Sequence, residues 1–397
     1  MLIEKNVIND FRSRLADYIA VVIVFLMGIG AVMVFSASSN LSYELDLRRF
    51  YDFPGLRQIL FFPLAVAILL AASCIDYRWL RLHETWWKSP VLWILAIATG
   101  LLGLVLLPQV GTEINQARRW LRIAIGPASV SFQPSELAKW TMVFVLAALC
   151  SRLGPDIRRY WARFVPLCLL IGLVCGLIVI EDFGTAAFIA LISSVMLILA
   201  GVRFWHLLTL LPPAGAGFVA ALVQSPHRLK RLQAFLDPEK WGDTVAYQAN
   251  QSLVAIGSGG VWGKGLGEGV AKYGHLPEDT TDFVFAIVGE ELGLVGTVTV
   301  IALFILFLAL GLTVALRCRD RFGRLAASGV ILAIGIQAAL NIGVVTVVLP
   351  TKGIPLPFIS AGGTSMLLSA AAVGVLLNIA SQTGRADDPP EMATTQC

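Results

Sequence analysis

Long apolar runs separated by short polar segments dominate the pattern of this chain. Runs of about 18 or more apolar residues recur from end to end, and each is long enough to cross a bilayer as a helix. The strict alternation of a membrane-barrel strand is absent from the sequence. We predict ten membrane spans, at about residues 17–38, 57–75, 90–107, 136–151, 164–181, 184–200, 206–223, 284–315, 325–349 and 357–381. The eighth is long enough to tilt or to project from the bilayer.

The polar segments between these runs are too short to form a second domain. We therefore expect an all-α polytopic protein with one transmembrane domain over residues 17–381, in which a large loop at about 224–283 joins spans seven and eight. Residues 1–16 form a leader without a small-residue cleavage site, so we expect it to be retained. The tail, residues 382–397, is short and polar, and we expect it to be disordered.

Composition supports this class and excludes others. Hydrophobic residues make up 57% of the 397 positions, against roughly 45–50% in soluble proteins. The six cysteines lie mostly in or at the ends of spans without metal-site spacing, so we interpret them as packing residues. No convincing internal repeat supports an inverted-repeat transporter. The glycines of residues 257–269 match neither nucleotide-binding motif, and we interpret them as sites of tight turns.

The distribution of lysine and arginine predicts the orientation. An even number of spans places both termini on one side of the membrane. With that side inside, the inner segments hold sixteen lysines and arginines and the short outer loops hold six. Positive residues are enriched on the cytoplasmic side. We therefore expect cytoplasmic termini, with the loops at about 108–135 and 224–283 on the outer side.

Two candidate binding features lie in and after the first outer loop. Arg118 and Arg119 precede Trp120 and suit either interfacial anchoring or a paired-guanidinium site for a pyrophosphate. Glu136 and Lys139 lie three residues apart at the start of a span, on one helix face. They form a self-contained ion pair, or Lys139 faces an anionic lipid headgroup from a wet cavity.

Five acidic residues crowd the start of the eighth span. We expect Thr280 or Thr281 to cap this span and Asp282 to lie in its first turn. Capping does not account for Glu290 and Glu291, which lie two turns deeper. An aspartate at the membrane surface, beside a basic loop, is suited to act as a general base on a lipid headgroup.

Other segments supply polar residues on the outer side. Lys264 makes the glycine-rich segment basic, and Asp182 is expected to cap the helix that follows it. Lys352 lies in a turn rich in proline and glycine. Residues 360–365, which include Ser365, interrupt the start of the tenth span. Such a break lines a cavity or forms a glycine-packed helix crossing.

Several long motifs, in this order, resemble the SEDS family (shape, elongation, division and sporulation), whose members are FtsW, RodA and SpoVE. The motifs are ARRWL, QPSELAKW, DFGT, QSLVAIGSGGVWGKGLG, HLPEDTTDFVFAIVGEELGLVG and NIGVVTVVLPTKGIPLPFISAGGTS. The resemblance extends from about residue 17 to 381. The forms LPTKGIPLPF and KYGHLPE are more similar to the division member than to the elongation member. The chain departs from the family pattern at Gln116-Ala117, at Glu181, where a proline is usual, and at Ala361, where a tyrosine is usual.

The resemblance implies a ten-span peptidoglycan glycosyltransferase of the bacterial cytoplasmic membrane. Such enzymes polymerise lipid II into glycan strands on the outer face, and the division member does so at the septum. The family's essential aspartate corresponds to Asp282, which would act as general base. Cations must stabilise the departing pyrophosphate. The candidates for substrate binding are Arg118, Arg119, Lys139, Lys264 and Lys352, together with Glu136, Glu290, Glu291 and Ser365.

The resemblance also implies partners. They are a class B penicillin-binding protein, which is a transpeptidase with one span, and other proteins of the division or elongation complex; nucleic acid is not expected. It implies no organic cofactor, leaves open a divalent cation (Mg²⁺ or Mn²⁺), and assigns no metal ligands. Three alternatives stay open: a lipid II flippase, a non-catalytic scaffold, and a RodA-like elongation enzyme. Because the charged candidates cluster toward the outer side, we favour the polymerase over the flippase.

Overall fold

The computed structural model describes residues 14–38, 53–114, 117–125, 128–223, 226–237, 247–273, 276 and 278–385. Most of the predicted leader and most of the predicted disordered tail lie outside these residues. In the part that is described, every predicted span contains an apolar helix. These helices are α2 (Leu15–Ser38), α3 (Pro54–Cys74), α4 (Pro90–Val105), α5 (Pro134–Leu153), α6 (Val165–Val179), α7 (Phe183–Leu199), α8 (Phe204–Leu208) with α9 (Leu211–Val223), α12 (Val284–Arg317), α13 (Arg321–Val345) and α14 (Gly363–Arg385).

Seven of these apolar segments have both the length and the hydropathy to cross a membrane, and three others are shorter apolar helices. The chain is therefore a predominantly α-helical, multi-pass membrane protein, as the apolar runs predicted. Short 3-10 turns and one π turn connect some of the helices, at Tyr77–Leu80, Trp86–Lys88, Gly154–Arg158 and Tyr160–Phe164. The deepest part of the bundle is α5, α13 and α14, each more than half buried along its span, whereas only 22% of the span is buried in α3 and in α6.

Several helix boundaries differ from the prediction for local reasons. α13 begins at Arg321, four residues early, because the Asp320 side chain caps it by accepting from the Gly323 N–H at 2.8 Å. α14 begins only at Gly363. Residues 350–362, which contain three prolines, form an irregular segment instead, here called the proline loop.

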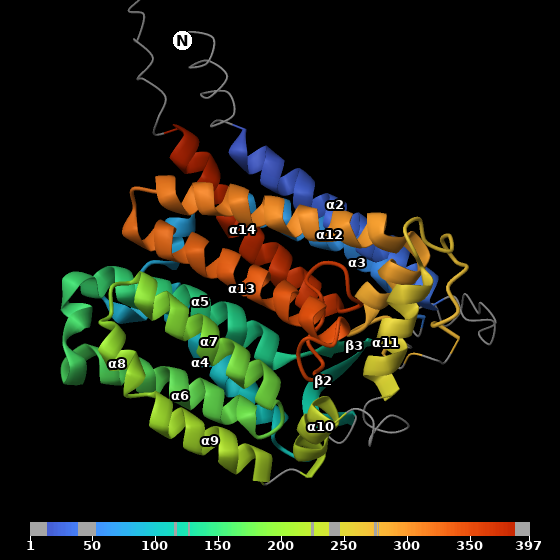
Figure 1. Ribbon diagram of the computed structural model, residues 1–397. Coiled ribbons are helices and arrows are strands. Elements are labelled where there is room, and N and C mark those ends of the chain that lie inside the picture. Colours follow the sequence, from blue (N-terminus) through green and yellow to red (C-terminus); the bar gives the residue numbers. More distant parts are fainter. Residues whose placement is uncertain are drawn as a thin grey trace, which may run out of the picture.

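The two longest loops between the apolar helices contain structure that the sequence pattern did not predict. Between α4 and α5 the chain forms a three-stranded antiparallel sheet of β1 (Gly111–Ile114), β2 (Ala117–Ile125) and β3 (Ala128–Phe132) in the order β1-β2-β3. Between α9 and α12 lie two further helices, α10 (Pro226–Leu236) and α11 (Tyr247–Ser258). Figure 1 shows the sheet, α10 and α11 gathered at one end of the bundle. The start of α2 and the end of α14 lie at the other end, which agrees with an even number of spans.

α12 is broken near its start, and the glycine-rich loop (residues 259–272) fills the break. Gly293 has φ 66° and ψ −158°, which no helix accommodates. The Lys264 N–H donates to the Glu290 carbonyl at 3.0 Å, and the Leu294 N–H donates to the Gly260 carbonyl at 2.9 Å. Main-chain groups released by the break thus find partners inside the protein, as a membrane environment requires.

The glycines of this loop are explained by close approach to α12. At Gly263, φ is 80° and an added Cβ would lie 2.1 Å from the Glu291 carbonyl oxygen. At Gly259, an added Cβ would lie 2.0 Å from the Gly289 carbonyl oxygen. Side chains at either position would push the loop off the helix.

We predict that Gly263→Ala destabilises the protein more than Gly267→Ala does. Both glycines have positive φ, 80° and 85°, so both variants carry backbone strain of about 1–2 kcal/mol. Only at Gly263 does the new Cβ also collide with α12, because at Gly267 nothing lies within 4 Å. Thermal unfolding of the two purified variants in detergent measures the difference. Equal losses would show that the loop does not dock tightly on the break.

Candidate active site

Asp282 lies in a turn that is pressed against the proline loop. The Ala361 N–H donates to the Thr280 carbonyl at 2.8 Å, and the Ser360 hydroxyl donates to the Thr281 carbonyl at 2.5 Å. An added Cβ at Gly353 would lie 2.7 Å from Asp282 Oδ2. The carboxylate therefore lies directly beside the main chain of the proline loop, and a glycine there leaves room for it.

The predicted cap of this helix is wrong. Phe283 is the N-cap residue of α12 and no side chain makes a capping hydrogen bond. The Thr281 hydroxyl instead donates to Glu278 Oε2 at 2.9 Å. Asp282 consequently precedes the first turn and does not cap it, so its presence needs another explanation than helix capping.

The environment of Asp282 raises the pKa of its carboxyl to about 7. Burial is the largest cause, since an ionised carboxylate loses hydration there. The negative charge of Glu278 adds to the rise, and that of Asp182 adds a smaller part. The guanidiniums of Arg231 and Arg119 oppose it. A carboxyl with a pKa near neutrality is suited to accept and release a proton under physiological conditions.

Arg119 on β2 lies against the start of α7. Its Nε donates to the Glu181 carbonyl at 2.9 Å, and its guanidinium lies 3.8 Å from Asp182 Oδ2. Asp182 caps α7 as predicted, because its Oδ1 accepts from the Thr185 N–H at 3.0 Å. Since Arg119 also influences the Asp282 carboxyl, the sheet, α7 and the Asp282 turn border one polar site.

The side chain of Arg118 does not lie beside that of Arg119. Its guanidinium lies 3.5 Å from Glu113 on the neighbouring strand, and its N–H donates to Glu181 Oε2 at 2.8 Å. Adjacent residues of a strand point to opposite faces. The predicted pair of guanidiniums is therefore divided between different partners, and only Arg119 is linked to Asp282.

Lys352 brings a second cation to the same end of α7. Its ammonium lies 5.3 Å from the centre of the Phe183 ring, and an added Cβ at Gly184 would lie 3.0 Å from its Nζ. Because the next residue, Gly353, touches Asp282, the proline loop links this lysine to the acid. The arrangement offers one titratable acid with Arg119 and Lys352 nearby, which suits a substrate carrying a phosphate.

Glu136, Lys139 and Ser365 form a separate, buried cluster. Lys139 Nζ lies 2.7 Å from Glu136 Oε2 and donates to Gln337 Oε1 at 2.9 Å. The Ser365 hydroxyl donates to the same Glu136 oxygen at 2.9 Å. The Lys139 side chain is only 1% exposed. These contacts favour the self-contained ion pair over contact with a lipid headgroup.

The deeper glutamates also have internal partners. Lys264 Nζ lies 2.7 Å from Glu290 Oε1, and Glu290 also accepts from the Val270 and Ala271 N–H groups. Glu291 pairs with Lys272 at 3.1 Å and accepts from the Ser36 hydroxyl of α2. Both ion pairs fasten the glycine-rich loop to α12, which favours a structural role for Lys264, Glu290 and Glu291.

Residues that the sequence did not assign to the site complete its surroundings. Arg231 of α10 and Glu278 act on the Asp282 carboxyl, but α10 itself was not predicted. Gln337 and Asn341 could have been recognised from the sequence, because two amides four residues apart share one face of an apolar helix and indicate a polar contact there. Among the described residues, no group of three histidine, cysteine, aspartate or glutamate side chains could hold a metal ion.

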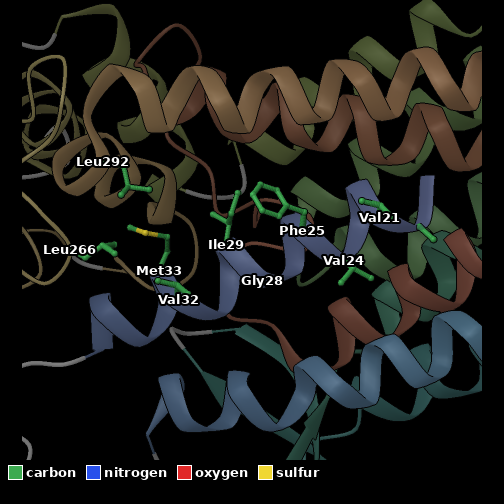
Figure 2. Close-up of a pocket in the computed structure, with 10 residues that line it drawn as sticks. Val21, Val24, Phe25, Gly28, Ile29, Val32, Met33, Leu266 and Leu292 are labelled. Carbon is green, nitrogen blue, oxygen red and sulfur yellow. The ribbon is translucent and has the colours of Figure 1, made fainter. Parts of the chain in front are cut away.

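The structure also contains an apolar groove with a volume of about 600 Å³ (Figure 2). It runs along α2 toward the glycine-rich loop. The lining residues are Ala20, Val21, Val24, Phe25, Gly28, Ile29, Val32, Met33, Leu266 and Leu292. None of them is titratable, so the groove offers no acid–base chemistry.

Comparison with known proteins shows relatives that are similar over most of the chain. A relative from Trichlorobacter lovleyi, named "Probable peptidoglycan glycosyltransferase FtsW", is 36% identical over 93% of this chain and 94% of its own length. Stage V sporulation protein E of Bacillus subtilis is 38% identical over 91% of this chain and 95% of its own.

Solved structures show the same fold. One is a chain of a peptidoglycan synthase complex whose title describes coordination of polymerization and crosslinking. It matches with a TM-score of 0.70 and 27% identity, covering 91% of this chain and 97% of that one. The rod shape determining protein RodA of Thermus thermophilus matches with a TM-score of 0.61 and 28% identity, covering 91% and 95%. Residues 17–385 match the family of cell cycle proteins that comprises FtsW, RodA and SpoVE, and the chain belongs to that family.

Proposed function

We propose that this protein is a peptidoglycan glycosyltransferase that polymerises lipid II, the undecaprenyl-pyrophosphate-linked disaccharide peptide. The observation that carries the proposal is Asp282, a carboxyl with a pKa near neutrality on which Arg119 acts, and which lies against Gly353, the residue after Lys352. Relatives named as peptidoglycan glycosyltransferases support the reaction class. The site faces the outer side of the bacterial cytoplasmic membrane, and both termini are cytoplasmic.

The reaction needs a base and a stabilised leaving group. The acceptor's 4-hydroxyl attacks the anomeric carbon of the donor sugar, forming the new glycosidic bond. The bond from that carbon to the pyrophosphate oxygen breaks, and undecaprenyl pyrophosphate leaves with the electron pair. Asp282 takes the hydroxyl proton. Arg119 and Lys352 offset the charge that develops on the pyrophosphate.

Other parts of the assignment follow the family. Mg²⁺ keeps several waters and commonly binds substrate phosphates, so Mg²⁺ or Mn²⁺ would bind the pyrophosphate of the substrate, and we assign it no ligand among the described residues. The ion would neutralise pyrophosphate charge. We assign the polymerase to septal synthesis, with a class B penicillin-binding protein as partner. The neighbouring synthase complex, in which polymerization and crosslinking are coordinated, supports this pairing.

We predict that Asp282→Asn abolishes polymerisation, because the amide cannot accept the hydroxyl proton. The loss should be about 10²- to 10⁴-fold, the usual contribution of a general base. The assay supplies labelled lipid II to the purified protein with its cognate transpeptidase and separates the glycan products on a gel. Glu268→Gln serves as the matched control, since Glu268 is an acid of the glycine-rich loop outside the proposed site.

The same assay separates the alternatives. Polymer from Asp282→Asn at the wild-type rate would reject the base assignment. If wild type makes no polymer with partner present, transport of labelled lipid II across vesicles would test the flippase. If the protein binds the partner but shows neither polymerisation nor transport, the scaffold hypothesis would be favoured.

We predict that the polymerisation rate rises with pH along a limb centred near 7, because only the ionised Asp282 accepts a proton. Glu278→Gln should move this limb to lower pH, since the charge of Glu278 raises the Asp282 pKa. Initial rates across the neutral range measure both effects. A limb that stays in place in Glu278→Gln would contradict this source of the shift.

The raised pKa of Asp282 makes the stability of the folded protein depend on pH. The native state holds the Asp282 proton more tightly than the unfolded chain, in which the pKa is about 3.8. The contribution of Asp282 to stability is therefore largest at low pH, and it falls as pH rises from about 4 to about 7.

We predict opposite outcomes for Lys352→Met and Lys139→Met. Lys352 lies by the proposed pyrophosphate position, so its loss should slow polymerisation with little change in melting temperature. Lys139→Met leaves Glu136 buried without its charge partner, which costs about 3–5 kcal/mol. Thermal unfolding and polymerisation assays on both variants test the contrast. Recovery of stability in Lys139→Met with Glu136→Gln would confirm the ion pair as its cause.

A further inference from the structure

Asn341 of α13 lies beneath the proposed site and has no part in the chemistry described above. Its side chain is buried, with 1% exposed. The Nδ2 group donates to the Asp282 carbonyl at 2.8 Å and to the Ile354 carbonyl at 2.7 Å. One amide group thus joins the main chain of the Asp282 turn to the proline loop. We propose that Asn341 is a positioning residue that sets the direction of the Asp282 carboxylate. This inference rests on the proposed role of Asp282.

The turn before α12 is pinned at three successive carbonyls. Thr280 accepts from the Ala361 N–H and Thr281 from the Ser360 hydroxyl, both of which belong to the proline loop. Asp282 accepts from Asn341, which belongs to a buried helix. Only the third contact therefore ties the catalytic residue itself to the rigid part of the bundle.

The proline loop is held by the same face of α13. Gln337, one turn before Asn341, donates to the Pro355 carbonyl at 2.8 Å through Nε2. Its Oε1 accepts from Lys139. The two amides thus place the loop relative to the buried ion pair, and through Asn341 they place Asp282 relative to the loop that carries Lys352.

The orientation of the Asn341 amide follows from its partners. Both are carbonyl oxygens, which only accept, so the NH₂ group must face them. The Oδ1 atom is buried, and in the described part of the chain it has no hydrogen-bond partner. An unpaired buried acceptor costs about 1–3 kcal/mol. A polar group retained at such a cost is expected where geometry for function matters more than stability.

The test compares Asn341→Leu with Asn378→Leu. Asn378 is a buried amide of α14 that likewise donates to a main-chain carbonyl, that of Ser73, at 2.8 Å. It belongs to the other end of the bundle, where it also accepts from the Tyr77 N–H. The leucine side chain is similar in shape to that of asparagine, and both substitutions remove buried hydrogen bonds. Both variants are therefore expected to have a lower melting temperature.

Only Asn341→Leu should alter the reaction. We expect kcat for lipid II polymerisation to fall by about 10- to 100-fold, as misplaced catalytic groups do, with KM within about twofold. The acid limb of the rate should move to lower pH, because a loosened turn admits water to the carboxyl. The charged groups that act on Asp282 are the same in both variants: Glu278, Asp182, Arg119 and Arg231.

A readout independent of polymerisation accompanies the kinetics. A carbodiimide that modifies protonated carboxyls, followed by peptide mass spectrometry across neutral pH, reports the titration of Asp282 directly. Its midpoint should fall in Asn341→Leu and stay at the wild-type value in Asn378→Leu.

Three results would overturn the inference. Equal loss of activity in both variants, with an unchanged pH limb and labelling midpoint, would make Asn341 merely structural. Full activity of Asn341→Leu, when wild type is active and Asp282→Asn is inactive, would reject the positioning role alone. Wild-type polymerisation by Asp282→Asn would reject the proposed function, and the positioning role with it.

Discussion

The ion pair between Lys139 and Glu136 is the interaction on which the rest of the structure depends. Removing two opposite charges from water costs several kcal/mol per ion, which their attraction offsets only when further hydrogen bonds complete the arrangement. Gln337 and Ser365 provide those bonds. Because these residues come from α5, α13 and α14, the pair fixes the three most buried helices relative to one another. The second amide atom of Gln337 then holds the proline loop, so the position of the candidate active site depends on the buried pair.

Most of the fold was predictable from the apolar runs, since a stretch long enough to cross a bilayer has few alternatives to a helix. The predicted helix boundaries were wrong where local chemistry determines them. Proline and glycine in residues 350–362 delay α14, and the Asp320 cap advances α13. The sheet was missed because β1 and β3 are short, with 4 and 5 residues, and because β2 contains Arg118 and Arg119 side by side, which hides the alternation of a strand.

The site was only partly predictable, because one sequence does not reveal which charges are paired. Asp282 and Glu290 looked similar as acids near the start of a span. The fold distinguishes them: Lys264 and two main-chain N–H groups surround Glu290, whereas Asp282 is half-buried and subject to the further negative charge of Glu278. Lys264 lies 26 residues from Glu290 along the chain, and Ser36 lies 255 residues from Glu291. Contacts between positions so far apart follow only from the tertiary structure.

The internal pairing of these charges has an evolutionary consequence. Glu291 and Lys272 are each almost fully buried, so losing one partner leaves an uncompensated charge, whereas replacing both by apolar residues is often tolerated. A lineage can therefore change such a pair readily only when both positions change together. Among relatives, Lys272 and Glu291 should covary, and so should Lys139 and Glu136. Within the described part of the chain, Asp282 forms no comparable ion pair, and its identity should depend on the reaction.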